Sequence, residues 1–190
     1  MLQCEKEDYS MRCSWAKSKE AIEYHDHQWC KETHDERMLF KMLVLEGMQA
    51  GLSWDTILKK EEAYKQAFDD FDYQKIASYS NEKIESLNEA EGIIHNRLKI
   101  NSIISNAKAF LKVQEEFGSF DHYIWSFVDF KVIDHCYVDE KEIPASDALS
   151  TKISKDLKKR GFKFVGPVII YSYLQAIGIY NDHLMDCEWR

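Results

Sequence analysis

The sequence contains few residues that interrupt helices, with two prolines and seven glycines among its 190 residues. The long stretches between these residues leave little room for the many short strands of a β-sandwich or β-barrel. No apolar run approaches the roughly 20 residues of a membrane span, and the polar residues 1–8 lack the apolar centre of a signal peptide. We therefore expect a mostly helical, cytoplasmic protein with no membrane partner.

Cysteine and positive charge are also scarce. The five cysteines are an odd number, scattered along the chain, which does not fit a secreted disulfide framework and favours free thiols or metal ligands. Lysine and arginine total 25 against 33 acidic residues, and the net charge is −8. Proteins that bind nucleic acid usually show a basic surface, so this balance disfavours such a partner unless positive charge gathers on one face.

The apolar content of 45% is enough for one hydrophobic core, so we expect a single domain over residues 1–190, with 1–10 as a loosely ordered extension. Thr33 and Glu36 stand at the spacing of a capping box. Apolar periodicity predicts helices over 33–50, 54–68, 80–92, 119–128, 146–160 and 165–179, a long helix with apolar residues from Ile100 to Leu111 that ends before Gly118, and a loop over 129–145.

One candidate metal site joins the two ends of the chain. His183 and Cys187 lie four residues apart at the end of the last predicted helix, which places both side chains on one face. A closed site needs two more ligands, and Cys13 and His25 are of the right kind. Four other residues compete for these two places, namely Cys4, His27, Cys30 and His34. A site of this composition would have a structural role, with no open position for water.

Glu46 is the second feature with chemical potential, because it lies in a long apolar helix face just before Gly51–Trp54. A buried carboxylate is costly unless it is paired or functional. Glu46 could pair with a lysine or cap a neighbouring helix. Alternatively, it could face a pocket lined by Trp54, Trp15 and Tyr24, although aromatic residues at helical spacing are more often ordinary core.

Positive charge gathers in two places. Lys155, Lys158, Lys159, Arg160 and Lys163 cluster near one helix end, and His95, Arg97 and Lys99 follow Gly92. Either group could be a solvated face. A helix pair joined by a glycine turn also offers backbone N–H groups and lysines to a DNA phosphate.

Eight segments of the sequence together carry a family resemblance. They are Arg12–Trp15, Tyr24–Trp29, Leu45–Trp54, Lys59–Lys60, Trp125–Val128, Ala145–Ser150, Lys158–Gly166 and Asn181–His183. In this order they resemble the 3-methyladenine DNA glycosylase I family, a branch of the helix-hairpin-helix glycosylases. The likeness runs from about residue 11 to residue 187, nearly the whole chain, which makes the set far more specific than any one motif.

The resemblance implies an all-α domain in which one structural zinc ion per chain clamps the N- and C-terminal segments together. The implied zinc ligands are Cys13, His25, His183 and Cys187. The implied activity is base-excision repair: a monomer flips 3-methyladenine out of alkylated double-stranded DNA, hydrolyses its N-glycosidic bond and releases the free base. No lysine stands out as a Schiff-base nucleophile, so we expect a monofunctional glycosylase without lyase activity.

The resemblance also implies roles for single residues. Glu46 and Tyr24 would read the extruded base, Trp54 would stack on it, and Ser172 would lie near the pocket. Trp15 would add a further aromatic face, and Glu46 is the candidate catalytic residue. At the DNA, the resemblance implies that Leu52 probes the helix and that the hairpin around Gly92 grips the backbone. The two basic clusters add Lys99 and Lys163 as candidate contacts to the DNA.

Three positions depart from the family's pattern, of which Pro167, after Gly166, is a tolerated variation. Ala21 stands where a tyrosine is usual, three residues before Tyr24, and Leu98 stands where a glycine is common in the hairpin. Ala21 and Leu98 keep a catalytically idle DNA-binding relative open as an alternative. The acidic net charge keeps open a zinc-stabilised helical interaction module. The sequence does not decide whether methylated guanines are also removed.

Overall fold

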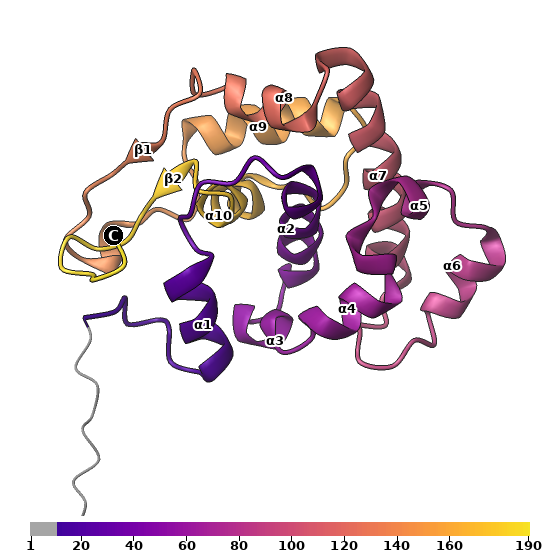
Figure 1. Ribbon diagram of the computed structural model, residues 1–190, viewed down its shortest axis with the longest axis horizontal. Helices are drawn as coiled ribbons and strands as arrows, with labels where there is room; N and C mark the ends of the chain where they lie inside the picture. Colours follow the sequence, from indigo (N-terminus) through magenta and orange to yellow (C-terminus); the bar gives the residue numbers. More distant parts are fainter. Residues whose placement is uncertain (1–10) are drawn as a thin grey trace, which may run out of the picture.

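The computed structural model describes residues 11–190, which form a mostly helical fold (Figure 1). The predicted extension at residues 1–10 lies outside the described residues. The helices are α1 Lys19–His27, α2 Glu36–Gln49, α3 Trp54–Leu58, α4 Glu61–Ala67, α5 Tyr73–Ala77, α6 Asn81–Leu87, α7 Arg97–Phe117, α8 Phe120–Ser126, α9 Ala148–Lys159 and α10 Pro167–Ala176. Two short 3-10 helices, η1 Asp69–Phe71 and η2 Glu140–Glu142, and two strands, β1 Ile133–Asp134 and β2 Tyr180–Asn181, complete the described elements.

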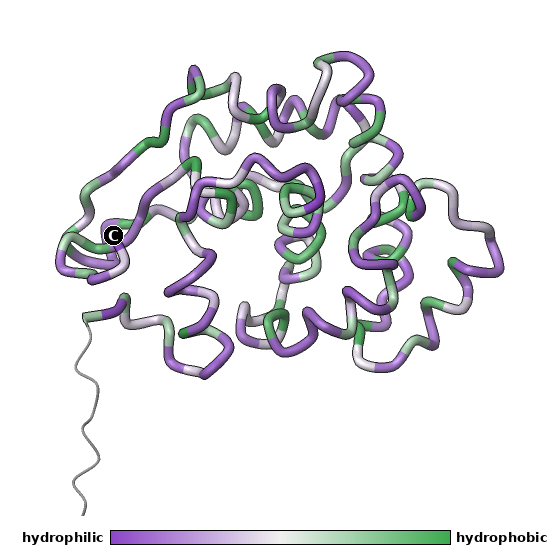
Figure 2. Tube along the Cα trace, in the orientation of Figure 1, coloured by the Kyte–Doolittle hydropathy of each residue, from purple (hydrophilic) through white to green (hydrophobic). Residues whose placement is uncertain are grey.

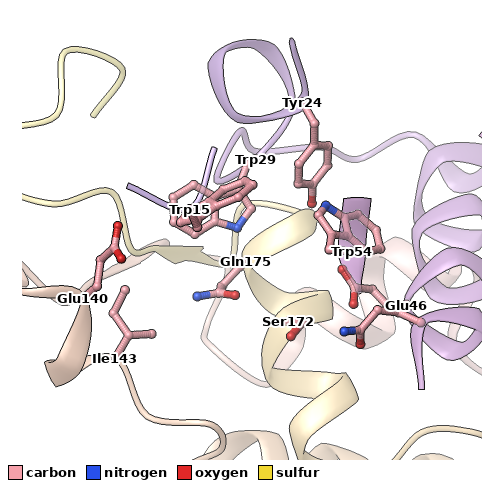
Figure 3. A pocket seen from close by; sticks show the side chains of 10 residues that line it. Trp15, Tyr24, Trp29, Glu46, Trp54, Glu140, Ile143, Ser172 and Gln175 are labelled. Atoms are coloured by element: carbon pink, nitrogen blue, oxygen red, sulfur yellow. The ribbon is translucent and has the colours of Figure 1, made fainter. Parts of the chain in front are cut away.

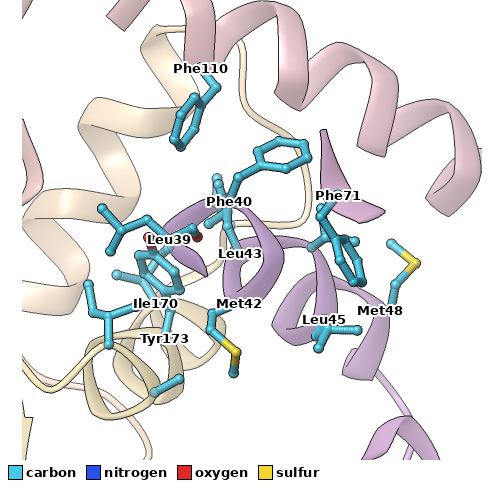
Figure 4. Packing of buried hydrophobic residues seen from close by; sticks show 14 of the residues in the cluster. Leu39, Phe40, Met42, Leu43, Leu45, Met48, Phe71, Phe110, Ile170 and Tyr173 are labelled. Carbon is cyan, nitrogen blue, oxygen red and sulfur yellow. Dashed lines mark hydrogen bonds between the residues drawn. The ribbon is translucent and has the colours of Figure 1, made fainter. Parts of the chain in front are cut away.

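Helices α2 and α10 form the centre of the molecule, with the other helices around them (Figure 1). All residues of α2 from Leu39 to Met48 are buried except Lys41, because the helix is apolar on nearly every side. In Figure 4, Leu39 of α2 lies beside Ile170 and Tyr173 of α10, and the Tyr173 hydroxyl donates to the Leu39 carbonyl at 3.1 Å. Each such buried apolar side chain contributes about 1.5–3 kcal/mol to folding.

Hydropathy follows this arrangement along the chain (Figure 2). Hydrophobic residues predominate along α10, whereas α9 alternates between hydrophobic and hydrophilic residues. In α9, Ile153 and Leu157 are buried, and the lysines are on the outside. No helix in residues 11–190 has both the length and the apolar character to cross a bilayer.

The start of α2 differs from the sequence prediction. Asp35, rather than Thr33, is the N-cap, and its carboxylate accepts from the Met38 N–H at 2.8 Å. Glu36 does not return to this cap. Its carboxylate accepts from the backbone N–H groups of Phe120 at 3.2 Å and Asp121 at 2.7 Å, so it caps the neighbouring helix α8. The capping box predicted at Thr33 and Glu36 is therefore wrong, although both residues have structural partners.

The predicted helix over 54–68 is two helices. α3 ends at Leu58, where the Lys60 N–H bonds to the Ile57 carbonyl at 3.0 Å in a tight turn, and α4 then begins at Glu61. The predicted helix over 80–92 is also shorter, because α6 ends at Leu87. Short helices without a long apolar stripe, such as α1 and α5, leave little periodicity in the sequence and were not predicted.

The turn between α6 and α7 requires Gly92. Its φ of +81° lies in the left-handed region, and a Cβ at this position would lie 2.7 Å from the Ala63 Cβ. The Lys60 ammonium donates to the Gly92 carbonyl at 2.7 Å, and the Ile94 N–H donates to the Tyr64 hydroxyl at 3.2 Å. Helix α4 therefore fixes the conformation of this turn.

The C-terminal segment is not helical where the sequence placed the second metal pair. Helix α10 ends at Ala176, and β2 then pairs in parallel with β1, which lies in the segment 129–145 predicted as a loop. His183 and Cys187 follow β2 in irregular backbone, so the expected helical spacing between them is wrong. Among the bonds that hold this segment in place, the Met185 N–H donates to the Tyr137 carbonyl at 2.9 Å and the Glu188 N–H donates to the Met11 carbonyl at 3.0 Å.

Candidate functional site

A cavity of about 410 Å³ opens among α1, α2, α3, α10 and the segment around η2, a volume suited to a small organic ligand. Figure 3 shows aromatic side chains along one side of it and polar groups of α2 and α10 along the other. The lining residues are Trp15, Tyr24, Trp29, Glu46, Gln49, Trp54, Glu140, Ile143, Ser172 and Gln175. The five residues that the sequence assigned to a base pocket are all among them.

Three tryptophans and one tyrosine form the aromatic side of the cavity. The rings of Tyr24 and Trp54 meet edge to face with centroids 5.1 Å apart, and those of Trp15 and Trp29 do so at 5.1 Å. In residues 11–190, no group accepts a hydrogen bond from the buried Trp54 Nε1. Flat aromatic faces and a spare donor suit a planar heteroaromatic ligand.

Glu46 lies in this aromatic cavity with only 3% of its surface exposed. In the described part of the chain, no lysine or arginine pairs with it and no group donates a hydrogen bond to it. Burial raises the pKa of Glu46 to about 8, and burial together with Glu46 raises the pKa of Tyr24 well above its usual value. The alternative role of Glu46 as a paired or capping residue is therefore not realised.

Several lining residues were not predicted. Trp29 follows the end of α1 in a turn, so helical periodicity from Tyr24 does not place it. Glu140 and Ile143 come from the least periodic part of the sequence, where Glu140 accepts from the Ser14 hydroxyl at 2.7 Å. Gln175 is one turn after Ser172 on α10, and this spacing was the one signal that could have found it.

A second cluster brings together Cys13, His25, His183 and Cys187, all buried, with their ligand atoms within 4.8 Å of one another. The Cys187 Sγ lies 3.3 Å from His183 Nδ1 and 3.6 Å from His25 Nε2, and the Cys13 Sγ lies 4.0 Å from His183 Nδ1. Burial raises the pKa of the Cys13 thiol and lowers that of His183. These residues could hold a metal ion.

The outer nitrogens of both histidines have fixed partners. His25 Nδ1 lies 2.8 Å from the Asp26 carboxylate, which also pairs with Arg12, and His183 Nε2 lies 3.3 Å from the Trp29 carbonyl. Partners of this kind orient metal-binding imidazoles. The His25 and Trp29 rings stack at 5.6 Å, so the cluster also supports an aromatic wall of the cavity.

The residues assigned to DNA occupy different environments. Leu52 is 38% exposed in the turn after α2, where Gly51 has a φ of +81° and the Gln49 amide donates to the Leu52 carbonyl at 3.0 Å. Gly92 and Lys163 are exposed. Leu98 is 73% exposed and shares a groove with Lys163 and Phe164.

Lys99 does not fit the role predicted for it. Only 6% of its surface is exposed, and its ammonium donates to the carbonyls of Met48 at 2.6 Å and Ala50 at 2.8 Å. Lys99 therefore caps the carboxyl end of α2 and links α7 to the Gly51 turn. An ammonium that donates to two backbone carbonyls is not available to a phosphate. The basic residues after Gly92 gave no sign in the sequence that one of them is buried.

Comparison with known proteins agrees with this geometry. The sequence profile of methyladenine glycosylases matches residues 15–190. The chain is 45% identical over 177 residues to DNA-3-methyladenine glycosylase 1 of Escherichia coli, covering 93% of this chain and 95% of that protein. It is 42% identical over 180 residues to the DNA-3-methyladenine glycosylase of Haemophilus influenzae, covering 94% and 97%.

A solved structure extends the likeness to three dimensions. The 3-methyladenine DNA glycosylase I of Staphylococcus aureus superposes with a TM-score of 0.89 at 43% identity, over 91% of this chain and 92% of that one. A helical fold with an aromatic pocket and a buried carboxyl group is suited to an enzyme that acts on an extruded base. The chain belongs to the methyladenine glycosylase family.

Proposed function

We propose that this protein removes 3-methyladenine from alkylated DNA by hydrolysing the N-glycosidic bond. The observation that carries the proposal is the unpaired Glu46 carboxyl group inside an aromatic pocket. The E. coli and H. influenzae relatives are DNA-3-methyladenine glycosylases, and the S. aureus structure concerns recognition of 3-methyladenine.

The pocket recognises charge as well as shape. The methylated base carries a positive charge while it is attached to DNA, whereas normal adenine is neutral. A cation beside Glu46 stabilises the carboxylate, so base binding is coupled to loss of the proton that burial otherwise retains on Glu46. The faces of Trp54, Tyr24 and Trp15 attract the same cation, each by about 0.5–2 kcal/mol.

Hydrolysis needs little further help, because a cationic base is already a good leaving group. The protein must extrude the nucleotide, at a cost of a few kcal/mol, and hold the base where Glu46 stabilises its charge. Within residues 11–190, the lining of the cavity includes no lysine that could form a Schiff base. This supports a monofunctional glycosylase that uses water as the nucleophile and has no lyase activity.

The Cys13, His25, His183 and Cys187 cluster is proposed as a structural zinc site. Tetrahedral zinc, with Zn–S of about 2.3 Å and Zn–N of about 2.0–2.1 Å, separates its ligand atoms by about 3.3–3.8 Å. Three sulfur–nitrogen pairs of the cluster lie 3.3, 3.6 and 4.0 Å apart, close to this spacing, and all four ligand atoms lie within 4.8 Å of one another. Because four protein ligands leave no position for water, the ion would clamp the two ends of the chain and support Trp29 without entering the reaction.

DNA is proposed to bind on the side of the molecule that carries the Gly51 and Gly92 turns. Leu52 is exposed beside the pocket-lining Gln49, which suits a side chain that fills the space left by an extruded nucleotide. Helix α6, the Gly92 turn and helix α7 would form the helix-hairpin-helix element that grips the backbone. Lys163 would add positive charge, while Lys99 holds the Gly51 turn from within. The protein would act as a monomer with one domain.

Release of free base from methylated DNA tests this function directly. The parent protein should release 3-methyladenine, and Glu46→Gln should lose about 1–3 kcal/mol of transition-state stabilisation, because one charged contact is replaced by a mispaired amide. DNA binding without base release would indicate the idle relative. An absence of salt-dependent DNA binding would instead indicate an interaction module.

A further inference from the structure

Gln175 is the polar lining residue whose orientation the structure fixes most firmly. Its side chain is 9% exposed, and its Nε2 donates to Asp182 Oδ2 at 2.8 Å. Asp182 is completely buried and also accepts from the Tyr171 hydroxyl at 2.8 Å, while His135 Nδ1 lies 2.6 Å from its other oxygen. A carboxylate surrounded by donors only accepts, so the Gln175 amide cannot turn its oxygen toward Asp182 without losing this bond.

The fixed amide leaves the Gln175 Oε1 toward the cavity. In Figure 3 this oxygen lies on the side of Ser172 and Glu46, and the nitrogen lies on the opposite side. In residues 11–190, no group donates a hydrogen bond to Oε1. The cavity therefore contains a preoriented neutral acceptor in addition to the Glu46 carboxyl group.

We propose that Gln175 selects adenine-type over guanine-type bases by accepting a hydrogen bond from the exocyclic amino group at C6. Adenine carries a donor at this position, whereas guanine carries a carbonyl acceptor. If guanine enters the pocket, its carbonyl oxygen faces the fixed Gln175 Oε1. Both atoms are acceptors, so both remain without a hydrogen bond in a buried site. Because an amino group has two hydrogens, Gln175 adds to Glu46 as an acceptor and does not replace it.

Asp182 is the positioning residue in this arrangement. It is distant from the base side of the amide and acts through the orientation of Gln175, with Tyr171 and His135 holding it in place. This inference rests on the proposed function, because it specifies which base the same pocket accepts.

The experiment compares binding of free 3-methyladenine and free 3-methylguanine, followed by tryptophan fluorescence, since Trp15, Trp29 and Trp54 line the cavity. Gln175→Met keeps the length of the side chain and removes the acceptor. The ratio of the two affinities should fall by about tenfold, the size expected when one buried hydrogen bond is lost. Gln175→Asn keeps an amide but withdraws the oxygen, so it should lower the same ratio and serves if the first variant does not fold.

Gln114→Met is the matched control, because Gln114 is a half-buried glutamine that bonds to Glu36 and Tyr73 outside the cavity. It should leave the affinity ratio unchanged even if the melting temperature falls. Equal losses for both bases in the Gln175 variants, or a parent that does not distinguish the bases, would overturn the inference alone. A parent that binds neither base would overturn the proposed function as well.

Discussion

Replacing Glu46 by glutamine should produce a stability difference that grows with pH. The carboxyl group has a pKa of about 8 in the fold because it is buried, against 4.5 in an unfolded chain. Between these values the folded state holds more protons than the unfolded state, so rising pH destabilises the parent protein. Because glutamine does not titrate, Glu46→Gln does not lose this part of its unfolding free energy as the pH rises.

The magnitude follows from the two pKa values. The difference between 4.5 and about 8, multiplied by about 1.4 kcal/mol per pH unit, gives about 5 kcal/mol when ionisation is complete. Between about pH 5 and about pH 8, the unfolding free energy of the variant should rise by about 3.5 kcal/mol relative to that of the parent.

Urea unfolding of the two proteins at both pH values measures this difference. Titration of the other groups, including the metal cluster, cancels because both proteins share it. The slopes with urea concentration should match, so that the difference reports stability alone. A difference between the two proteins that is the same at both pH values would refute the assignment of Glu46 as an unpaired buried acid.

Three further changes test other parts of the account. Zinc analysis should find about one ion per chain, and Cys187→Ser should lower both the zinc content and the melting temperature. An unchanged melting temperature after chelation would refute the structural role. Lys163→Glu should weaken DNA binding and reduce its salt dependence by about one counterion, whereas the control Lys75→Glu on α5 should change neither. Equal effects of the two substitutions on DNA binding would show that the DNA does not bind at Lys163. Lys99→Met should lower the free energy of unfolding by about 1–3 kcal/mol, because it leaves the Met48 and Ala50 carbonyls unpaired. The exposed control Lys112→Met should change stability little, and equal melting temperatures of the two variants would contradict the capping role of Lys99.

The sequence predicted the long and strongly periodic helices well. The apolar stripes of α7, α9 and α10 lie in the core, as periodicity indicated. Short elements depend on distant partners instead: β1 exists because Ile133 pairs with Tyr180. The sequence paired His183 and Cys187 through a helical spacing that is absent, and the two residues lie in one cluster because an irregular segment brings them together.

Some residues of the candidate site could be identified from the sequence and others could not. Glu46 was identifiable because a carboxyl group in an apolar stretch is unusual, and the resemblance grouped it with Tyr24 and Trp54 around what proves to be one cavity. The spacing from Ser172 could have placed Gln175 at the cavity, but the orientation of its amide was not predictable, because it depends on a carboxylate seven residues away. Lys99 was misassigned because a charge pattern does not separate an exposed ammonium from one that caps a helix.

The central claim is that the ionised Glu46 carboxylate recognises a positively charged base. The most direct test is the pH dependence of kcat/KM for release of 3-methyladenine from methylated DNA, because this quantity reports ionisation in the free enzyme. For the parent it should rise by up to about tenfold per pH unit and level off near the Glu46 pKa of about 8, whereas Glu46→Gln should be lower and independent of pH in this range. The same rise with pH in both proteins would contradict the claim, since the titrating group would then lie elsewhere.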